Sequence, residues 1–457
     1  MQLDEYLSEL RTKRVAVIGV GTSNTPLIEL LCRAGVSVTA RDRRKKEDFG
    51  AEYDRLTALG AGFRLGADYL AELDEDVIFK TPGVRPDIPE LSAAFSRGSV
   101  ITSEMEMFFE VCPCPIIAIT GSDGKTTTTT LVAELLKAAG YRVHLGGNIG
   151  TPLVDKVPDI DSSDYAVVEL SSFQLMTMTQ SAGTAIVTNV SPNHLDYHTG
   201  MDEYIASKKN VFVHQSREGL LVVNADNEIS AGFASEACGT VRTFSRREQQ
   251  PEGCWFDGEN IYYSEDGEST MLISRSEIAL RGLHNIENLM AAFCAVIDLV
   301  GIEKCRRVAR TFTGVEHRIE PVRTLGGVQF YNDSIASSPT RTIAGLVSFE
   351  QKVILIAGGY DKHIPYDDFG RVVRDRVKTL VLLGATGHKI RSAVLNADNG
   401  ELPEMLEAST MEEAVSLAAS RAVSGDVVIL SPASASFDMF KNFEERGNCF
   451  KKIVSAL

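Results

Sequence analysis

The sequence predicts an α/β protein whose sheets are mostly parallel. Short β-branched runs alternate along its 457 residues with stretches that carry leucine and alanine at helical spacing. The clearest unit joins a predicted strand at residues 116–119 to a predicted helix at residues 127–139, which would end at Gly140. Glycines occupy the turn between them. Such strand–turn–helix units place ligands at the carboxyl edge of a sheet.

That turn has the order of groups that a phosphate-binding loop needs. Gly121 and Gly124 let backbone N–H groups close on phosphate oxygens at a helix N-terminus, Lys125 supplies a positive charge, and the Thr126 hydroxyl can bind Mg²⁺. The commonest longer pattern would require a glycine where Ile119 stands, so the loop is a shortened relative. The alternative is an ordinary turn with an exposed lysine.

Two further segments point to nucleotide chemistry. Residues 166–170 form a predicted strand that places Glu169 near its carboxyl end, where a carboxylate suits Mg²⁺.

Near the N-terminus, a strand at residues 14–18 is followed by a Gly-x-Gly turn, but Asn24 stands where a dinucleotide site has its third glycine. Asp42 follows about twenty residues later, where such folds bind a ribose. For the charged run 42–46 a solvated surface is an equal alternative.

Composition narrows the class of partner. The formal net charge of −16 argues against nucleic acid or an anionic membrane as the main partner. The eight cysteines include no C-x-x-C pair, which favours a reduced cytoplasm over a zinc site or a disulfide framework. The N-terminus lacks the basic head and apolar region of a signal peptide, and no run of 18 apolar residues occurs. We therefore expect a cytoplasmic protein without membrane insertion.

Shifts in composition predict three domains. The proline-rich segment 111–115 reads as a linker, residues 240–282 carry hairpin signals, and three strands near residues 353, 380 and 427 form another α/β unit. The predicted domains are residues 1–110, 111–314 and 315–457.

Taken together, the motifs resemble the Mur ligase family, ATP-dependent amide-bond-forming enzymes of peptidoglycan precursor synthesis. The matching motifs lie in the family's order at residues 120–126, 146–150, 169–174, 193–196, 284–288, 316–318 and 332–334. Residues 431–438 and 441–447 are most similar to the member that adds D-glutamate. The resemblance implies a Rossmann-like N-terminal domain, a central P-loop ATPase-like parallel-sheet domain and a C-terminal Rossmann-like α/β domain.

The implied activity is an ATP-dependent acid–amino-acid ligase. It would add D-glutamate to UDP-N-acetylmuramoyl-L-alanine through an acyl phosphate, giving ADP and phosphate, in cell wall biogenesis that supports cell shape and cell division. We expect a cytoplasmic enzyme that is a monomer and whose partners are small-molecule substrates. Two alternatives differ in chemistry: another ligase of the family, similar to folylpolyglutamate synthase, and a nucleotide-dependent switch without ligase activity. A dehydrogenase is disfavoured by Asn24 and by the better phosphate loop elsewhere in the chain.

The resemblance also implies site residues. Those for ATP are Gly121, Ser122, Asp123, Gly124, Lys125, Thr126, Thr127, Asn285, Asn288, Arg318 and Asp333. Those for the UDP substrate are Thr22, Ser23, Asp42, Arg43, Thr81, Pro82, Gly83, Asn148 and Gln174. Those for D-glutamate are Lys362, Ser436 and Phe437.

Two Mg²⁺ ions are implied as well. Thr126 and Glu169 would hold the first, and His194 with a carbamylated Lys208 the second, so that Lys125, His194 and Lys208 are the implied catalytic residues. From spacing alone, Lys208 would be an exposed helix lysine.

The chain departs from the family pattern at two positions. Ile335 stands where the family commonly has a lysine, and Arg341 is a candidate to replace that positive charge. Asp123 stands where the phosphate loop usually has asparagine, which adds negative charge beside phosphate and makes Mg²⁺ and Lys125 more necessary.

Overall fold

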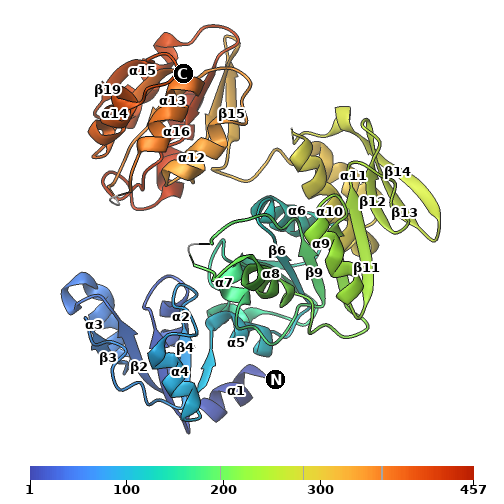
Figure 1. Cartoon of the computed structure of the whole chain (residues 1–457), viewed down its shortest axis with the longest axis vertical. Helices are drawn as coiled ribbons and strands as arrows, with labels where there is room; N and C mark the ends of the chain where they lie inside the picture. Colours follow the sequence, from blue (N-terminus) through green and yellow to red (C-terminus); the bar gives the residue numbers. More distant parts are fainter. Residues whose placement is uncertain (196, 281, 362–363) are drawn as a thin grey trace. The chain divides into compact units, whose positions relative to one another are not determined.

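The structure, a computed structural model, describes residues 1–195, 197–280, 282–361 and 364–457. The chain divides into two compact units, Met1–Phe312 and Thr313–Leu457 (Figure 1). The described residues form sheets of five, nine and six strands, the first two in the first unit. The predicted α/β class with mostly parallel sheets is confirmed. The boundary between residues 110 and 111 stays a prediction.

The five-stranded sheet has the order β3-β2-β1-β4-β5 and is parallel throughout. Its central strand is buried on both faces: Val15 and Val17 join one apolar cluster, whereas Ala16 and Ile18 join another. This explains why the strand is a continuous apolar run in the sequence. The strands are β1 (Arg14–Ile18), β2 (Ser37–Asp42), β3 (Gly62–Leu65), β4 (Val77–Lys80) and β5 (Val100–Thr102). The helices are α1 (Leu3–Leu10), α2 (Asn24–Arg33), η1 (Lys46–Asp48), α3 (Ala51–Ala58), α4 (Pro89–Ser96) and α5 (Glu104–Val111).

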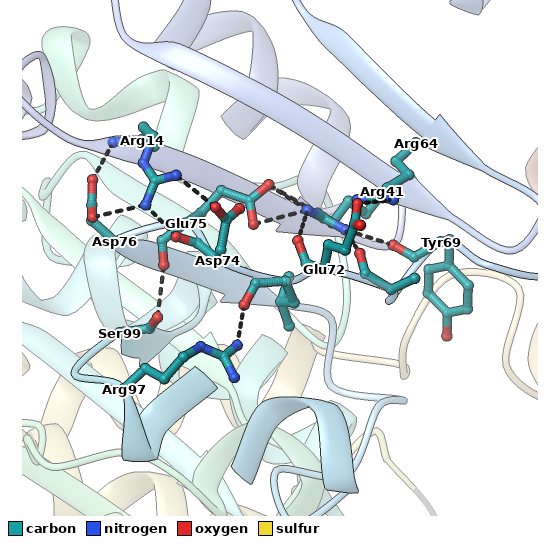
Figure 2. Close-up of polar contacts among 12 residues, drawn as sticks. Arg14, Arg41, Arg64, Tyr69, Glu72, Asp74, Glu75, Asp76, Arg97 and Ser99 are labelled. Atoms are coloured by element: carbon teal, nitrogen blue, oxygen red, sulfur yellow. Dashed lines mark hydrogen bonds and ion pairs between the residues drawn. The ribbon is translucent and has the colours of Figure 1, made fainter. Parts of the chain in front are cut away.

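A buried ion pair connects this sheet to the loop that precedes β4. The guanidinium of Arg41, on β2, donates to both carboxylate oxygens of Glu75 at 2.7 and 2.9 Å (Figure 2). It also donates to the backbone carbonyls of Tyr69, Ala71 and Glu72, so the loop folds around one cation. Arg41 is only 2% exposed and Glu75 only 5%.

The nine-stranded sheet has the order β14-β13-β12-β11-β10-β9-β6-β8-β7. It is parallel from β7 to β12, and β12, β13 and β14 form antiparallel hairpins, as predicted for residues 240–282. Its strands are β6 (Ile116–Thr120), β7 (Val143–Gly147), β8 (Tyr165–Glu169), β9 (Thr184–Val187), β10 (Leu220–Asn224), β11 (Thr240–Ser245), β12 (Gly253–Phe256), β13 (Asn260–Glu265) and β14 (Glu268–Ser274). Its helices are α6 (Lys125–Ala138), η2 (Val154–Asp159), α7 (Ser172–Leu175), α8 (Met201–Lys209), α9 (Glu228–Gly232), η3 (Phe233–Glu236), η4 (Arg275–Glu277), α10 (Leu283–Val300) and α11 (Ile302–Thr311).

Helix α10 packs along α6 and covers β10 and β11 (Figure 1). Among the described residues it is the one helix long and apolar enough to cross a membrane, but 67% of it is buried inside the protein. Its apolar residues therefore serve the core, where Leu289, Phe293 and Val296 lie.

The second unit holds a six-stranded sheet of order β15-β16-β20-β17-β18-β19, antiparallel only between β15 and β16. Its strands are β15 (Glu320–Leu325), β16 (Val328–Asn332), β17 (Val353–Ala357), β18 (Val377–Leu383), β19 (Glu404–Ala408) and β20 (Val427–Leu430). Its helices are α12 (Pro339–Leu346), α13 (Asp367–Arg376), α14 (Gly387–Asn396), α15 (Met411–Arg421) and α16 (Phe443–Ala456). The three strands predicted near residues 353, 380 and 427 are β17, β18 and β20.

The buried pair gives a test of stability. Arg41→Met should lower the free energy of unfolding by about 3–5 kcal/mol, because Glu75 would keep its charge in a buried site. Urea unfolding followed by circular dichroism measures this. The control is Arg14→Met, which should change the free energy of unfolding far less, because the pair with Asp74 is exposed to water. Equal losses in the two variants would contradict the role given to Arg41.

Candidate functional site

The predicted phosphate loop joins β6 to α6. Gly121 and Gly124 both have positive φ, 152° and 80°, and α6 begins at Lys125. A side chain on Gly121 would run into Thr188, and one on Gly124 would run into the amide oxygen of Asn288. The glycines are therefore required by the backbone and by close neighbours, and the predicted strand–loop–helix context is confirmed.

Two lysine amines converge on one carbonyl in this loop. The Nζ atom of Lys125 donates to the carbonyl oxygens of Gly121 and Ser122 at 3.0 and 2.8 Å. Lys208, on α8, donates to the same Gly121 oxygen at 2.8 Å. Lys208 is 1% exposed, so the reading of it as an exposed helix lysine is wrong. Burial, and then the charge of Lys125, hold the pKa of Lys208 well below its ordinary value.

Oxygen donors meet at the first turn of α6. The Thr126 hydroxyl donates to one carboxylate oxygen of Glu169 at 2.7 Å, and Asn148 donates to the other at 2.9 Å. Hydroxyl and carboxylate oxygens are ligands that Mg²⁺ prefers, and they lie at the phosphate loop. No group of three His, Cys, Asp or Glu side chains suited to a metal occurs among the residues that the structure describes. In nucleotide sites Mg²⁺ usually takes its remaining ligands from phosphate and water.

The predicted asparagines of α10 also reach this loop. Asn288 accepts a hydrogen bond from Thr128 at 3.3 Å and donates to Asn285 at 3.0 Å. Since Gly124 lies directly against Asn288, the structure places Asn288 at the phosphate loop, with Asn285 hydrogen-bonded beside it.

His194 lies in the segment between β9 and α8. Its φ of 55° is left-handed, and its ring meets the edge of Phe173 with centroids 5.0 Å apart. Phe173 lies on α7, four residues after Glu169 at the end of β8, so the histidine contacts the helix that follows this predicted metal ligand.

Seven of the nine predicted UDP residues lie at or just after the carboxyl ends of β1, β2 and β4, whereas Asn148 follows β7 and Gln174 lies on α7. The Asp42 carboxylate accepts hydrogen bonds from the backbone N–H groups of Val20 and Arg44, at 2.8 and 2.9 Å. Burial alone raises the pKa of Asp42, but these bonds and the Arg44 side chain outweigh it and lower the pKa below its usual value. Asn24 donates to the carbonyls of Ile18 and Gly19, which explains why it replaces a glycine there.

Of the other UDP residues, Thr22, Arg43 and Gly83 are exposed, and Ser23, Thr81 and Pro82 are half-buried. The first strand's turn and the Thr81 turn touch, because a side chain on Gly19 would meet that of Thr81. Gln174 instead accepts hydrogen bonds from the backbone N–H and the hydroxyl of Ser171 at 3.0 Å, as the third residue of a capping box. Its contact with substrate stays a prediction.

In the second unit, Asp333 follows β16 and is 3% exposed. Its carboxylate accepts a hydrogen bond from Ser431 at 2.6 Å and another from the backbone N–H of Ile319 at 3.2 Å. Burial raises the pKa of Asp333 to about 7. Arg318 lies on the surface of the same unit.

Ser436 is buried, whereas Phe437 is 62% exposed and packs its ring edge against Tyr360. Lys362 lies outside the described residues. At the position where the family lysine is missing, Arg341 donates to the carbonyl of Ile335 at 3.4 Å, so its side chain reaches that place.

One residue that the sequence analysis did not place in the site is Tyr204. Its hydroxyl lies 2.9 Å from that of Ser122, so a second residue of α8 holds the phosphate loop. Tyr204 precedes Lys208 by four residues, on the same face of a helix, and this spacing is the signal that could have revealed it.

A cavity of about 400 Å³ lies beside the segment that follows β11. Arg247, Trp255 and Arg275 are among the residues that line it. None of the predicted site residues lines it.

Comparison with known proteins identifies the family. Residues 119–296 match the family model of the Mur ligase middle domain. Residues 317–434 match the family model described as "Mur ligase, glutamate ligase domain". The UDP-N-acetylmuramoylalanine–D-glutamate ligase of Acetivibrio thermocellus is 52% identical over 461 residues, covering 100% of this chain and 99% of that one. The chain belongs to the Mur ligase family.

Other members agree in length and fold. The enzyme of the same name from Clostridium kluyveri is 50% identical and covers 99% of this chain and 98% of its own. Two solved structures share the family fold at low identity. The UDP-N-acetylmuramate–alanine ligase of Thermotoga maritima has a TM-score of 0.57 at 17% identity, covering 97% of this chain and 99% of its own. The pseudomurein peptide ligase type C of Methanothermus fervidus has a TM-score of 0.52 at 18% identity, with the same coverage.

Asp333 predicts how stability depends on pH. A carboxyl group whose pKa rises on folding is most favourable to the folded state at low pH, so stability should fall between about pH 4 and pH 7. Asp333→Asn should remove this fall. Urea unfolding of the whole chain across that range tests it, with Asp398→Asn, at an exposed carboxylate, as the control. An unchanged pH dependence in Asp333→Asn would contradict the assignment.

Proposed function

We propose that the chain joins D-glutamate to UDP-N-acetylmuramoyl-L-alanine and cleaves ATP to ADP and phosphate. One observation carries this: the chain aligns from end to end, at about half identity, with ligases of that name. The geometry supports it, because a lysine, a threonine and a glutamate converge on the phosphate loop.

ATP binds with its phosphates on the loop. The backbone N–H groups at the start of α6 and the Lys125 amine stabilise the negative charge that spreads over the transferring phosphoryl group. The L-alanyl carboxylate attacks the terminal phosphorus, giving an acyl phosphate and ADP. The amine of D-glutamate then attacks the acyl carbon, phosphate leaves with the bonding electron pair, and the amine loses a proton.

The metal ligands follow from the same geometry. Thr126 and Glu169 would hold one Mg²⁺, and His194 with Lys208 a second; when bound, such ions neutralise phosphate charge and polarise its oxygens. The buried Lys208 amine supports its carbamylation, because a lysine stripped of water gives up its proton readily and a neutral amine adds CO₂. The carbamate would turn a repulsive cation into a ligand with anionic oxygens.

The other substrates are assigned to the remaining predicted residues. The UDP moiety binds at the carboxyl edge of the five-stranded sheet, near Asp42 and the Thr81 turn. D-glutamate binds in the second unit near Ser436 and Phe437, with Lys362. We further propose the three domains 1–110, 111–314 and 315–457, a monomer, and a cytoplasmic location.

The direct test is phosphate release from ATP by the purified protein with UDP-N-acetylmuramoyl-L-alanine. D-glutamate should support turnover, and L-glutamate, glycine and L-lysine should not. Release with a different amine, or with none, would overturn the proposed function.

Lys125→Ala should lower turnover roughly a hundredfold or more, because it removes one electrostatic contact to the transferring group, worth about 2–4 kcal/mol. The matched control is Lys137→Ala on the same helix, whose amine pairs with Glu134 at the surface. Steady-state phosphate release measures both. Near wild-type turnover in Lys125→Ala would exclude this loop as the ATP site.

Lys208→Ala should be nearly inactive and should regain part of its activity with added acetate, which can supply the missing carboxylate oxygens. Lys208→Arg should not be rescued, because its guanidinium fills the space and stays charged. Lys209→Ala, which removes a surface pair with Glu236, is the control. Intact-protein mass of active enzyme should show the added CO₂. Ordinary activity in Lys208→Ala would remove the second metal from the mechanism.

A further inference from the structure

One helix touches both nucleotide-binding regions of the first unit. Helix α8 carries Tyr204 and Lys208, which bind the phosphate loop through the Ser122 hydroxyl and the Gly121 carbonyl, at 2.9 and 2.8 Å. Both residues are about 1% exposed, so this end of the contact is fixed by packing as well as by hydrogen bonds. A displacement of α8 would therefore move the loop that holds the phosphates.

The other contact of α8 is with the five-stranded sheet. Glu203 receives two hydrogen bonds from the guanidinium of Arg85, at 3.0 and 3.1 Å. Arg85 lies two residues beyond Gly83, in the turn assigned to the UDP moiety. The side chains are 21% and 24% exposed, and the Arg85 hydrogen bonds lower the pKa of Glu203 to about 2. Bidentate geometry fixes orientation as well as distance.

The segment before α8 is held by the same turn. The Tyr197 hydroxyl donates to the Pro82 carbonyl at 2.9 Å, and Arg85 donates to the Tyr197 carbonyl. His198 lies 2.9 Å from the Ser172 hydroxyl and 3.2 Å from Glu203. Thus the turn after β4 holds both α8 and the segment in which His194 lies.

We propose that Arg85 is a positioning residue that couples the UDP-substrate site to the ATP site through Glu203 and α8. This rests on the proposed function, since it takes the Thr81–Gly83 turn as the UDP site and the 121–126 loop as the ATP site. A ligand that orders the turn fixes Pro82 and Arg85, hence α8, and hence the phosphate loop. By linkage the effect is reciprocal: each ligand raises the affinity for the other by the same factor.

Calorimetry tests the coupling without turnover. The affinity for ADP is measured with and without saturating UDP-N-acetylmuramoyl-L-alanine, and the ratio of the two is the coupling factor. The wild-type protein should give a factor of about ten, within the range usual for coupled sites. Arg85→Ala should bring the factor close to one, while the affinity for ADP alone changes less than about threefold. Within the described part of the chain, the hydrogen bonds of Arg85 go to Asp87, Tyr197 and Glu203 rather than to the phosphate loop.

Three variants separate coupling from folding. Arg85→Lys should give an intermediate coupling factor, because an ammonium cannot make the bidentate contact with the Glu203 carboxylate. Glu203→Gln should also lower the factor, because a neutral amide loses the charge-assisted contact with Arg85. Arg64→Ala should leave the factor unchanged, because this residue of β3 forms a surface pair with Glu72 in the loop before β4. Thermal unfolding is recorded for each variant.

The outcomes are distinguishable. The coupling would be overturned, and the proposed function left intact, if the wild-type protein gave a coupling factor of one. The same holds if Arg85→Ala or Glu203→Gln kept the wild-type factor. A wild-type protein that binds neither ADP nor the UDP substrate would overturn the proposed function, and the coupling with it.

Discussion

The carbonyl of Gly121 accepts a hydrogen bond from each of two lysine amines, and the site depends on this shared acceptor. It lies at the end of β6, where the chain turns from strand to helix, so it ties Lys125 of α6 and Lys208 of α8 to the same peptide. Like charges so close repel, and the more buried amine loses its proton more readily. Burial and the nearby charge of Lys125 lower the pKa of Lys208, which supports the metal-ligand role proposed for Lys208 beside the phosphate-binding role proposed for Lys125.

The arrangement requires small residues and exact neighbours around the loop. Thr188 and Asn288 leave no room for a side chain at Gly121 or Gly124. The Thr126 hydroxyl is already oriented toward Glu169, so a hydrogen bond preorganises the oxygen donors that we propose for Mg²⁺. Such preorganisation lowers the cost of stabilising charge during the reaction.

Local patterns allowed the strands, the phosphate loop and the hairpins to be predicted, because each depends on residues within about a dozen positions of one another. Lys208, by contrast, meets a loop 87 positions away, and no local pattern reveals its burial. The Arg41–Glu75 pair joins residues 34 positions apart, so no local pattern reveals it either. The capping role of Gln174 could have been predicted from the sequence, since Ser171 lies three residues before it in the spacing of a capping box. The resemblance to a family supplied roles, such as that of His194, that physical reasoning from one sequence does not reach.

The central claim is that the L-alanyl carboxylate is phosphorylated before D-glutamate attacks, and isotope transfer tests it most directly. UDP-N-acetylmuramoyl-L-alanine carrying ¹⁸O in both carboxylate oxygens is incubated with ATP and D-glutamate, and the phosphate released is analysed by mass spectrometry. An acyl phosphate requires that one labelled oxygen leave with each phosphate. Phosphate without label, released together with the amide product, would contradict the account.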